Sequence, residues 1–159
     1  MMRNAVVPGS FDPVTLGHLD VISRSSKMFD RVIVAVLHNQ QKKPLFSVKE
    51  RMQLIEESTS TLKNVEVASF NGLLMDFASE HKASVIIKGL RTVADFEYEL
   101  QMATVNRQLN ENVDTFFIMT AANYAHLSSS IVKEVAKYQA DLTSMVSLPV
   151  ERALREKFN

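Results

Sequence analysis

Five short runs of apolar residues, mostly β-branched or aromatic, most constrain what this chain can fold into. They cover 5–7, 32–37, 65–70, 85–87 and 116–119, and stretches with helical features separate them. Because each run is apolar at successive rather than alternate positions, it is typical of a parallel strand buried on both faces. Strands that alternate with helices in this way predict an α/β sandwich.

The segments between and after these runs predict six helices. The clearest start signal is Ser47 followed by Glu50, an S-x-x-E capping box. Right-handed crossovers predict a doubly wound, five-stranded parallel sheet with flanking helices and the strand order 3-2-1-4-5. Pro149 suits the first turn of the last helix. The first expected helix begins near Thr15 or Gly17 and ends at Phe29, and the second begins after Ser47. The third spans 73–81, the fourth spans 94–109, the fifth begins at 128–130 and the last spans 150–158.

Length and charge limit the classes of function. A chain of 159 residues, 46% apolar and 23% charged, suits a single folded domain covering 1–159. Its 18 basic and 18 acidic residues balance, so we expect no binding to long nucleic acid or to an anionic membrane. The sequence has no cysteine, no run of membrane-spanning length and no signal-peptide core, which favours a soluble cytoplasmic protein.

Three segments that follow predicted strands carry residues suited to binding phosphate. They are 8–18 after the first strand, 88–91 after the fourth and 120–130 after the fifth. Since these strands are neighbours in the expected order, their carboxyl ends would bring the three segments to one crevice. Glycines permit close approach to the backbone, and helix starts offer free N–H groups. Positive charge would come from His18, Lys42, Lys88 and Arg91.

Each of these features alone has an ordinary structural explanation. A serine triplet at 128–130 is by itself more often an N-cap, and Gly9 with Ser10 is by itself a turn. A histidine at a helix start, such as His18, is by itself more often bonded to a nearby carbonyl. The sequence contains no G-x-G-x-x-G, Walker A or G-x-S-x-G motif and no metal-spaced pair of histidines, so no protein-held metal is expected. The convergence of three segments is what favours a phosphate site.

Two motifs and the segment between them resemble a known family. GSFDPVTLGH contains Thr15-Leu16-Gly17-His18, which resembles the T/H-x-G-H motif of nucleotidylyltransferases, and NYAHLSSSIVKEVA resembles their serine-rich motif. The intervening KGLRTVADFEYELQMATVNRQL is more specific. Together, over essentially the whole chain, they resemble the bacterial phosphopantetheine adenylyltransferases. The resemblance implies a Rossmann-like fold and transfer of AMP from ATP to 4'-phosphopantetheine, which yields dephospho-coenzyme A and pyrophosphate.

The resemblance also implies a nucleotide site. His18 would be the catalytic residue, which contacts the α-phosphate and stabilises the transition state. The serine triplet would hold the β- and γ-phosphates, and Mg²⁺ is expected to arrive with ATP rather than in a carboxylate cage. The implied ATP-binding residues are Ser10, Phe11, His18, Gly89, Leu90, Arg91, Glu99, Tyr124, Ala125, His126, Leu127, Ser128, Ser129 and Ser130.

An acceptor site follows from the same resemblance. Lys42 and Lys88 would bind the phosphate of phosphopantetheine. On the helix over 94–109, Tyr98, Met102 and Asn106 recur every four residues, so they share one helix face, which the resemblance assigns to the pantetheine channel. A different stripe on the same helix, formed by Phe96, Leu100 and Ala103, suggests a subunit interface, and members of the family are hexamers. The implied substrate-binding residues are Ser10, Lys42, Leu74, Lys88, Tyr98, Met102 and Asn106.

Departures from the family pattern and other functions stay open at this point. Lys88 stands where many members have arginine, so the charge is kept but the two-pronged fork is lost. Ala125 and His126 replace a common Ser-Phe pair, and Ser10 replaces threonine. The alternatives are a nucleotidylyltransferase for another acceptor, such as nicotinamide mononucleotide or glycerol phosphate, and a sensor that binds ATP or coenzyme A without turnover. A structural scaffold is a third alternative.

Overall fold

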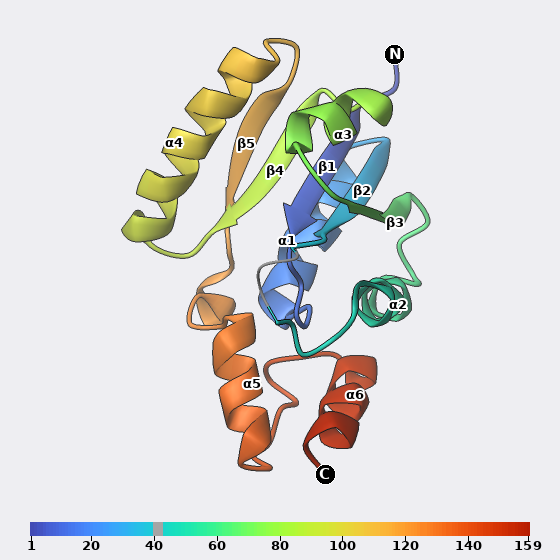
Figure 1. Ribbon diagram of the computed structural model, residues 1–159, viewed down its shortest axis with the longest axis vertical. Coiled ribbons are helices and arrows are strands. Elements are labelled where there is room, and N and C mark those ends of the chain that lie inside the picture. Colours follow the sequence, from blue (N-terminus) through green and yellow to red (C-terminus); the bar gives the residue numbers. More distant parts are fainter. Residues whose placement is uncertain (40–42) are drawn as a thin grey trace.

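The chain folds around one sheet of five parallel strands in the order β3-β2-β1-β4-β5, which confirms the predicted order (Figure 1). The computed structural model describes residues 1–39 and 43–159. Pairing is in register along the central strands, where Ala5 lies opposite Val32 on one side and Val85 on the other. The strands are β1 (Asn4–Gly9), β2 (Arg31–Leu37), β3 (Val65–Phe70), β4 (Val85–Leu90) and β5 (Asp114–Met119).

The helices begin and end within one or two residues of the expected positions. Ser47 caps its helix as predicted, because its side chain accepts a hydrogen bond from the N–H of Glu50 and the two residues complete a capping box. A short 3-10 helix, η1 (Ala122–Tyr124), was not predicted. The helices are α1 (Leu16–Met28), α2 (Val48–Ser58), α3 (Leu74–Glu80), α4 (Val93–Leu109), α5 (Ser129–Lys137) and α6 (Leu148–Phe158).

Two hydrophobic cores lie on opposite faces of the sheet, because alternate residues of a strand point to opposite sides. Val32, Val34 and Val36 of β2 belong to the larger core, which also contains residues of α1, α2, α5 and α6. Ile33 and Ala35 of the same strand belong to the smaller core, which contains residues of α3. This division explains why the central strands are apolar at every position.

Burial on both faces holds for the central strands and is wrong for the outer ones. β2 is buried at its five central positions, whereas β5 contains only exposed and half-buried residues. Phe116 in β5 is 49% exposed, and Met119 at its end is 77% exposed. β5 lies at the edge of the sheet, and helix α4 beside it buries none of its own residues. An apolar surface is therefore left along α4 and β5.

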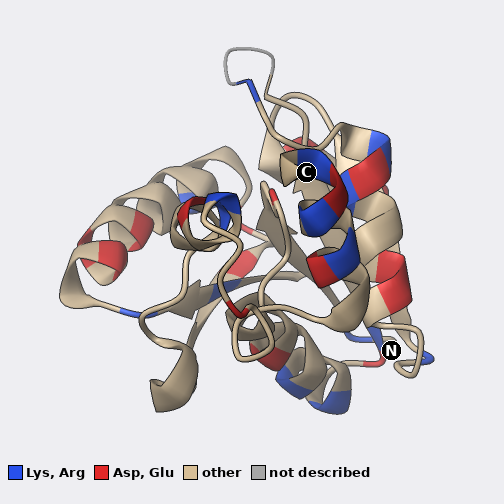
Figure 2. Cartoon of the chain, turned by 90° about the horizontal axis from the view of Figure 1, so that it is seen from below, with Lys and Arg blue, Asp and Glu red and all other residues tan. Residues whose placement is uncertain are grey.

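The carboxyl ends of the strands form one end of the molecule. Helices α5 and α6 lie beyond this end, at the bottom of Figure 1. Viewed from there, acidic and basic residues are intermixed on the helices (Figure 2). Among the described residues, no helix combines the length and the apolar character needed to cross a membrane.

Strand β4 extends three residues further than the sequence predicts, so that Lys88, Gly89 and Leu90 belong to the strand and not to a loop. The added residues continue the parallel pairing with β5, where Lys88, Gly89 and Leu90 lie opposite Phe117, Ile118 and Met119. The side chain of Val21 in α1 also packs closely against Gly89. A Cβ added at Gly89 would lie 2.9 Å from Cγ2 of Val21, closer than real Cβ atoms approach. Glycine at this position therefore lets α1 lie directly on the end of β4.

We expect Gly89→Ala to lower the free energy of unfolding by about 1–3 kcal/mol, the usual cost of an overpacked methyl group. Urea denaturation measures it. The double variant with Val21→Ala should recover part of the loss, because it removes the colliding methyl group. Gly17→Ala is the matched control, since a Cβ there meets its neighbours only at ordinary distances of 3.5 Å or more. A loss of stability at Gly89 that Val21→Ala leaves unchanged would contradict this explanation.

Candidate active site

A cleft of about 280 Å³ opens at the carboxyl ends of β1 and β4. The three segments that the sequence analysis expected to meet at one crevice all contribute to its wall. The turn after β1 and the start of α1 form one side, the end of β4 forms a second, and the segment between β5 and α5 forms a third. Its polar lining residues are Thr15, His18, Lys88, Arg91, Asp95, Glu99, Thr120, Ser128 and Ser129.

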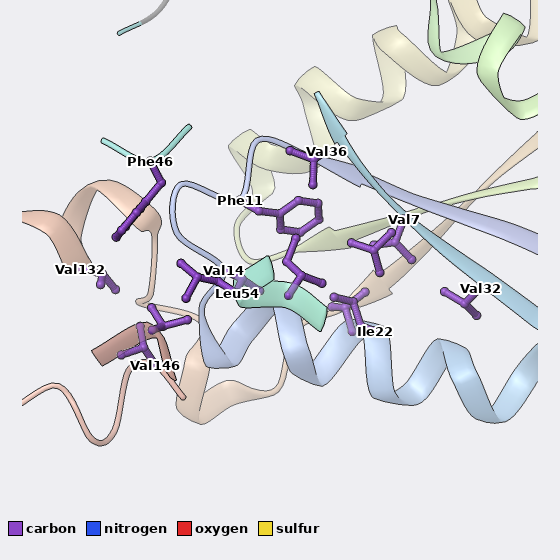
Figure 3. Close-up of a cluster of buried hydrophobic side chains, with 14 of the residues drawn as sticks. Val7, Phe11, Val14, Ile22, Val32, Val36, Phe46, Leu54, Val132 and Val146 are labelled. Atoms are coloured by element: carbon purple, nitrogen blue, oxygen red, sulfur yellow. The ribbon is translucent and has the colours of Figure 1, made fainter. Parts of the chain in front are cut away.

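The turn after β1 folds back on its own strand at Phe11. Phe11 has a φ of 49°, in the left-handed region that non-glycine residues seldom adopt. Its ring lies 3.0 Å from the position that a Cβ on Gly9 would take, so Gly9 makes room for the ring. Figure 3 shows this ring among buried side chains that include Val14 and Val36, and Phe11 is 3% exposed. The ring thus serves the core while its edge lines the cleft.

Two buried charged side chains hold this turn in place. Asp12, 7% exposed, accepts hydrogen bonds from the N–H groups of Leu45 and Phe46, each at 2.9 Å, and from Nζ of Lys133 at 3.0 Å. Arg51, 4% exposed, donates from Nη1 to the carbonyl of Ser10 at 2.8 Å and to that of Leu37 at 3.2 Å. The turn is therefore tied to β2, to α2 and to α5.

Sequence reasoning missed both of these residues, although Arg51 left a signal. Arg51, Leu54 and Ile55 are the buried residues of α2 and share one helical face. An arginine within a buried stripe is rare unless it has a structural partner, so its position in the pattern could have revealed it. Asp12 gave no such signal, because an aspartate before a proline reads as an ordinary turn residue.

His18 is held by the first turn of α1 and not by a carbonyl, so the ordinary explanation of a carbonyl-bound histidine is wrong. The N–H of Thr15 donates to Nδ1 of His18 at 2.9 Å, and the N–H of His18 donates to Oγ1 of Thr15 at 3.3 Å. The pair forms a capping box with histidine in place of the usual glutamate. Because Nδ1 accepts a hydrogen bond from a backbone N–H, the neutral ring must carry its proton on Nε2.

Burial and two cations keep this imidazole neutral. Desolvation, with the nearby charges of Arg91 and Lys88, lowers the pKa of His18 from 6.5 to about 4. The Phe11 ring contacts the imidazole edge to face, with ring centroids 5.1 Å apart. At neutral pH, His18 therefore presents an uncharged Nε2–H hydrogen-bond donor, lodged between two positive charges.

The two cations of the cleft are both paired with carboxylates of α4. Nζ of Lys88 lies 3.3 Å from Oε1 of Glu99, and Nε of Arg91 lies 3.2 Å from Oδ2 of Asp95. Arg91 also donates from Nη1 to the carbonyl of Leu127 at 2.6 Å, which ties the end of β4 to the segment before α5. These contacts fix the positions of both cations before any ligand binds.

The serine triplet begins α5, with Ser128 as its N-cap, and Ser128 and Ser129 line the cleft. Oγ of Ser128 accepts from the N–H of Ile131 at 3.1 Å, so the N-cap explanation is correct for this residue. Oγ of Ser129 donates to the carbonyl of Pro13 at 2.8 Å. No hydrogen bond in the described part of the chain uses the N–H groups of Ser129 and Ser130. A helix start with free N–H groups attracts anions.

A smaller cavity of about 110 Å³ adjoins the first and shares Lys88 and Glu99 with it. The face of α4 that the four-residue spacing identified lines it. Ala103, which the sequence analysis assigned to the other stripe, lines this cavity too. Leu74, at the start of α3, lies on the same wall. The cavity is lined by Leu74, Ile86, Lys88, Tyr98, Glu99, Met102, Ala103, Asn106 and Thr115.

Several predicted site residues lie outside the lining of both cavities. Ser10 and His126 are exposed. The carbonyl of Ser10 accepts a hydrogen bond from Arg51, so Ser10 helps to hold the turn after β1. Leu90 is half-buried at the end of β4, and Ser130 is exposed in the first turn of α5. Tyr124 and Ala125 are half-buried at and just after η1, where they border α1 at Gly17. Lys42 lies outside the described residues.

The described residues offer no ready metal cage. No group of three or more His, Cys, Asp or Glu side chains stands close enough to hold a metal ion in this part of the chain. The two carboxylates that line the larger cleft, Asp95 and Glu99, are each paired with a cation.

Comparison with known proteins identifies the family. The Cytidylyltransferase-like family matches residues 6–135, which include β1 through most of α5. A candidate nicotinate-nucleotide adenylyltransferase from Vibrio parahaemolyticus superposes with a TM-score of 0.75, with 17% identity over 99% of this chain and 95% of that one. A lipopolysaccharide core biosynthesis protein from Thermoplasma volcanium superposes with a TM-score of 0.54, with 25% identity over 76% of this chain and 98% of that one.

The pKa of His18 predicts how stability depends on pH. The unfolded chain binds a proton at this residue near the ordinary pKa of 6.5, whereas the folded chain binds it near 4. The contribution to stability is therefore complete above pH 6.5 and is lost as the pH falls toward 4. In His18→Gln the amide oxygen can still accept the N–H of Thr15 but does not titrate, so the loss of stability between pH 6.5 and 4 should be smaller.

Urea denaturation of both proteins at pH 7 and pH 5 measures this difference. Arg91→Gln serves as a control for the electrostatic part, because removing its charge should raise the pKa of His18 in an NMR titration. Equal losses of stability in the wild type and in His18→Gln would show that another group dominates this pH range.

Proposed function

We propose that this chain, which belongs to the cytidylyltransferase-like family, transfers AMP from ATP to 4'-phosphopantetheine and releases pyrophosphate. The observation that carries the proposal is the pair of adjoining cavities that share Lys88 and Glu99. One cavity offers donors suited to a nucleotide phosphate chain. The other is narrow and is lined by the α4 face that the sequence resemblance assigns to the pantetheine arm.

The reaction balances without a strong base. An ionised phosphate oxygen of the acceptor attacks the α-phosphorus of ATP, and the bond from that phosphorus to the bridging oxygen of the β-phosphate breaks. Pyrophosphate leaves with the electron pair, and the product is a phosphoanhydride. Because the nucleophile is already ionised at neutral pH, the protein has only to align two anions and stabilise charge on the α-phosphate.

The Nε2–H of His18 suits the α-phosphate oxygens. It is a fixed, neutral donor whose partner atom, Nδ1, is held by the backbone of Thr15. A preorganised donor in a partly desolvated site is worth far more than one in water. Since His18 is neutral at pH 7, it acts by donating a hydrogen bond and need not transfer a proton.

The other phosphates of ATP have donors within the same cleft. Arg91 lines the cleft with its guanidinium, and the start of α5 contributes Ser129, whose N–H group makes no hydrogen bond in the described part of the chain. Mg²⁺ bound to ATP would neutralise part of the phosphate charge. With both cleft carboxylates paired to cations, the ion is expected to be held mainly by ATP oxygens and water.

A different acceptor is the main alternative. The Vibrio parahaemolyticus structure is described for a nicotinate nucleotide, and its 17% identity supports a common fold alone. The feature that favours phosphopantetheine is the small second cavity of about 110 Å³, which combines apolar side chains such as Leu74 and Met102 with the charged Lys88. A slender, mostly uncharged arm fits such a cavity better than a nucleotide base and ribose do.

Pyrophosphate release tests the choice of acceptor. The protein with ATP and Mg²⁺ should release pyrophosphate when 4'-phosphopantetheine is added, and much less with nicotinamide mononucleotide, nicotinate mononucleotide or glycerol phosphate, the last also tried with CTP. Release with a mononucleotide but not with phosphopantetheine would overturn the acceptor. Binding of ATP in a calorimeter without release for any acceptor would favour the sensor.

His18→Ala should lower kcat by about 10²–10³-fold, the usual loss when one preorganised donor to a developing charge is removed. Its affinity for ATP should change much less, because the donor matters most in the transition state. His81→Ala is the matched control, since His81 stacks on Phe77 at the end of α3 and lies outside both cavities. A variant that folds and keeps its kcat would remove His18 from the chemistry.

Assembly into a homohexamer belongs to the same proposal. It is supported by the apolar surface along α4 and β5, where Phe96, Leu100 and Phe116 are each more than 40% exposed. Leu100→Glu would place a charge in that interface and should shift the oligomer toward smaller species in sedimentation velocity. A wild-type protein that sediments as a monomer at micromolar concentration would contradict the assembly.

A further inference from the structure

Lys88 and Glu99 stand at the boundary between the two cavities, and they are the residues that the two linings have in common. Their charged atoms are 3.3 Å apart, and their side chains are 26% and 19% exposed. Any anion that enters the smaller cavity and reaches Lys88 also approaches the carboxylate of Glu99. The pair therefore affects ligand binding on both sides.

Glu99 is held less firmly than the neighbouring carboxylate on α4. Asp95 accepts hydrogen bonds from the backbone N–H of Arg91 at 3.0 Å and from Nε of Arg91 at 3.2 Å. In the described part of the chain, the ion pair with Lys88 is the one polar contact that the Glu99 side chain makes. A rotation of the Glu99 side chain would cost that contact alone, so Glu99 is free to exchange partners.

The two cavities favour different partners for Glu99. A phosphate monoester beside Lys88 would be attracted by the ammonium group and repelled by the carboxylate, because like charges at short range disfavour each other. In the larger cleft, a nucleotide brings neutral donors, the ribose hydroxyls and the base amine, and a carboxylate among phosphate-binding groups can accept only from such donors.

We infer that Glu99 competes with the acceptor phosphate for Lys88, and that a nucleotide in the larger cleft relieves this competition by taking Glu99 as a hydrogen-bond acceptor. Glu99 is in this sense a specificity-determining and positioning residue, which makes binding of a phosphate monoester depend on prior binding of nucleotide. The inference rests on the proposed function, since it assigns the larger cleft to the nucleotide and the smaller cavity to the acceptor.

The coupling must be reciprocal. If a nucleotide strengthens binding of the acceptor by some factor, the acceptor strengthens binding of the nucleotide by the same factor. A neutral acceptor that lacks the phosphate has nothing to gain from Lys88, so its affinity should not depend on Glu99. Pantetheine and 4'-phosphopantetheine therefore form a matched pair of ligands for the test.

The test is isothermal titration of the full chain with each of these two acceptors, with and without a saturating non-hydrolysable ATP analogue. Glu99→Gln is the main variant, because it keeps the size of the side chain and removes its charge. Without nucleotide, Glu99→Gln should bind 4'-phosphopantetheine about 3- to 10-fold more tightly than the wild type, the range expected for a partly exposed ion pair. Pantetheine affinity should be unchanged.

The nucleotide arm measures the coupling itself. The factor by which the ATP analogue changes 4'-phosphopantetheine affinity should be about 3- to 10-fold more favourable in the wild type than in Glu99→Gln. Repulsion between the phosphates of the two ligands is common to both proteins and cancels in this ratio. Glu97→Gln replaces an exposed carboxylate on the same helix with a carboxamide, and this variant should behave as the wild type does.

The outcomes separate the inference from the function on which it rests. A wild type that binds neither acceptor, with or without nucleotide, overturns the proposed function. Binding of 4'-phosphopantetheine that is the same in Glu99→Gln and in the wild type, with equal coupling, leaves the function standing and overturns the inference. If Glu99→Gln does not fold, Glu99→Ala takes its place in the same comparison, because the repulsion between the two ligands cancels only in a ratio between two proteins.

Discussion

The carboxylate of Asp12 is the interaction on which the rest of the site depends. Three donors converge on it, from the backbone at Leu45 and Phe46 and from Lys133 of α5. A buried carboxylate left without them would be costly, so the turn can close only when α2's leading segment and α5 are both in place. The contacts that hold the turn therefore also hold one wall of the cleft.

The charges around the cleft are arranged about the turn that Asp12 holds. Arg51 is buried under the turn with one guanidinium nitrogen, Nε, unpaired in the described structure, and burial lowers its pKa. Lys88 and Arg91 add charge at the rim, and together with burial they keep His18 neutral. A protonated histidine would attract phosphate more strongly, but it would also be hard to maintain beside two cations. The fold instead uses the ring as a dipolar donor, with its orientation set by the helix cap at Thr15.

Much of the fold could be predicted from the sequence, because the central strands are apolar at every position and the helix caps are explicit. Ser47 and Glu50 show the clearest case, in which a local pattern and the tertiary structure agree. The outer strand β5 was harder, since an apolar sequence such as that around Phe116 reads as buried, while the isolated chain leaves it exposed. Propensity does not reveal how many neighbours a strand will have.

The site was predictable where strand order decides which residues meet, and not where a contact depends on side-chain packing. The gathering of His18, Lys88 and Arg91 followed from strand order alone. The anchoring role of Asp12 did not, because its partners lie 33 to 121 positions away in the chain. The length of β4 was also missed, since its last three residues pair with β5 about 29 positions further along the chain. A sequence shows which groups can meet at a strand end but not which of them will be used for support.

Helix α4 contributes both to the two cavities and to the exposed surface of the molecule. It supplies the carboxylates that hold both cations of the cleft and one wall of the second cavity, yet none of its residues is buried in the isolated chain. The Lys88–Glu99 and Arg91–Asp95 pairs tie it to the cleft, and Phe96 packs edge to face on Phe117 of β5. A ligand that exchanges partners with either pair must then change the forces that locate α4. The same helix also carries the apolar surface along α4 and β5, so the cleft and this surface share one element.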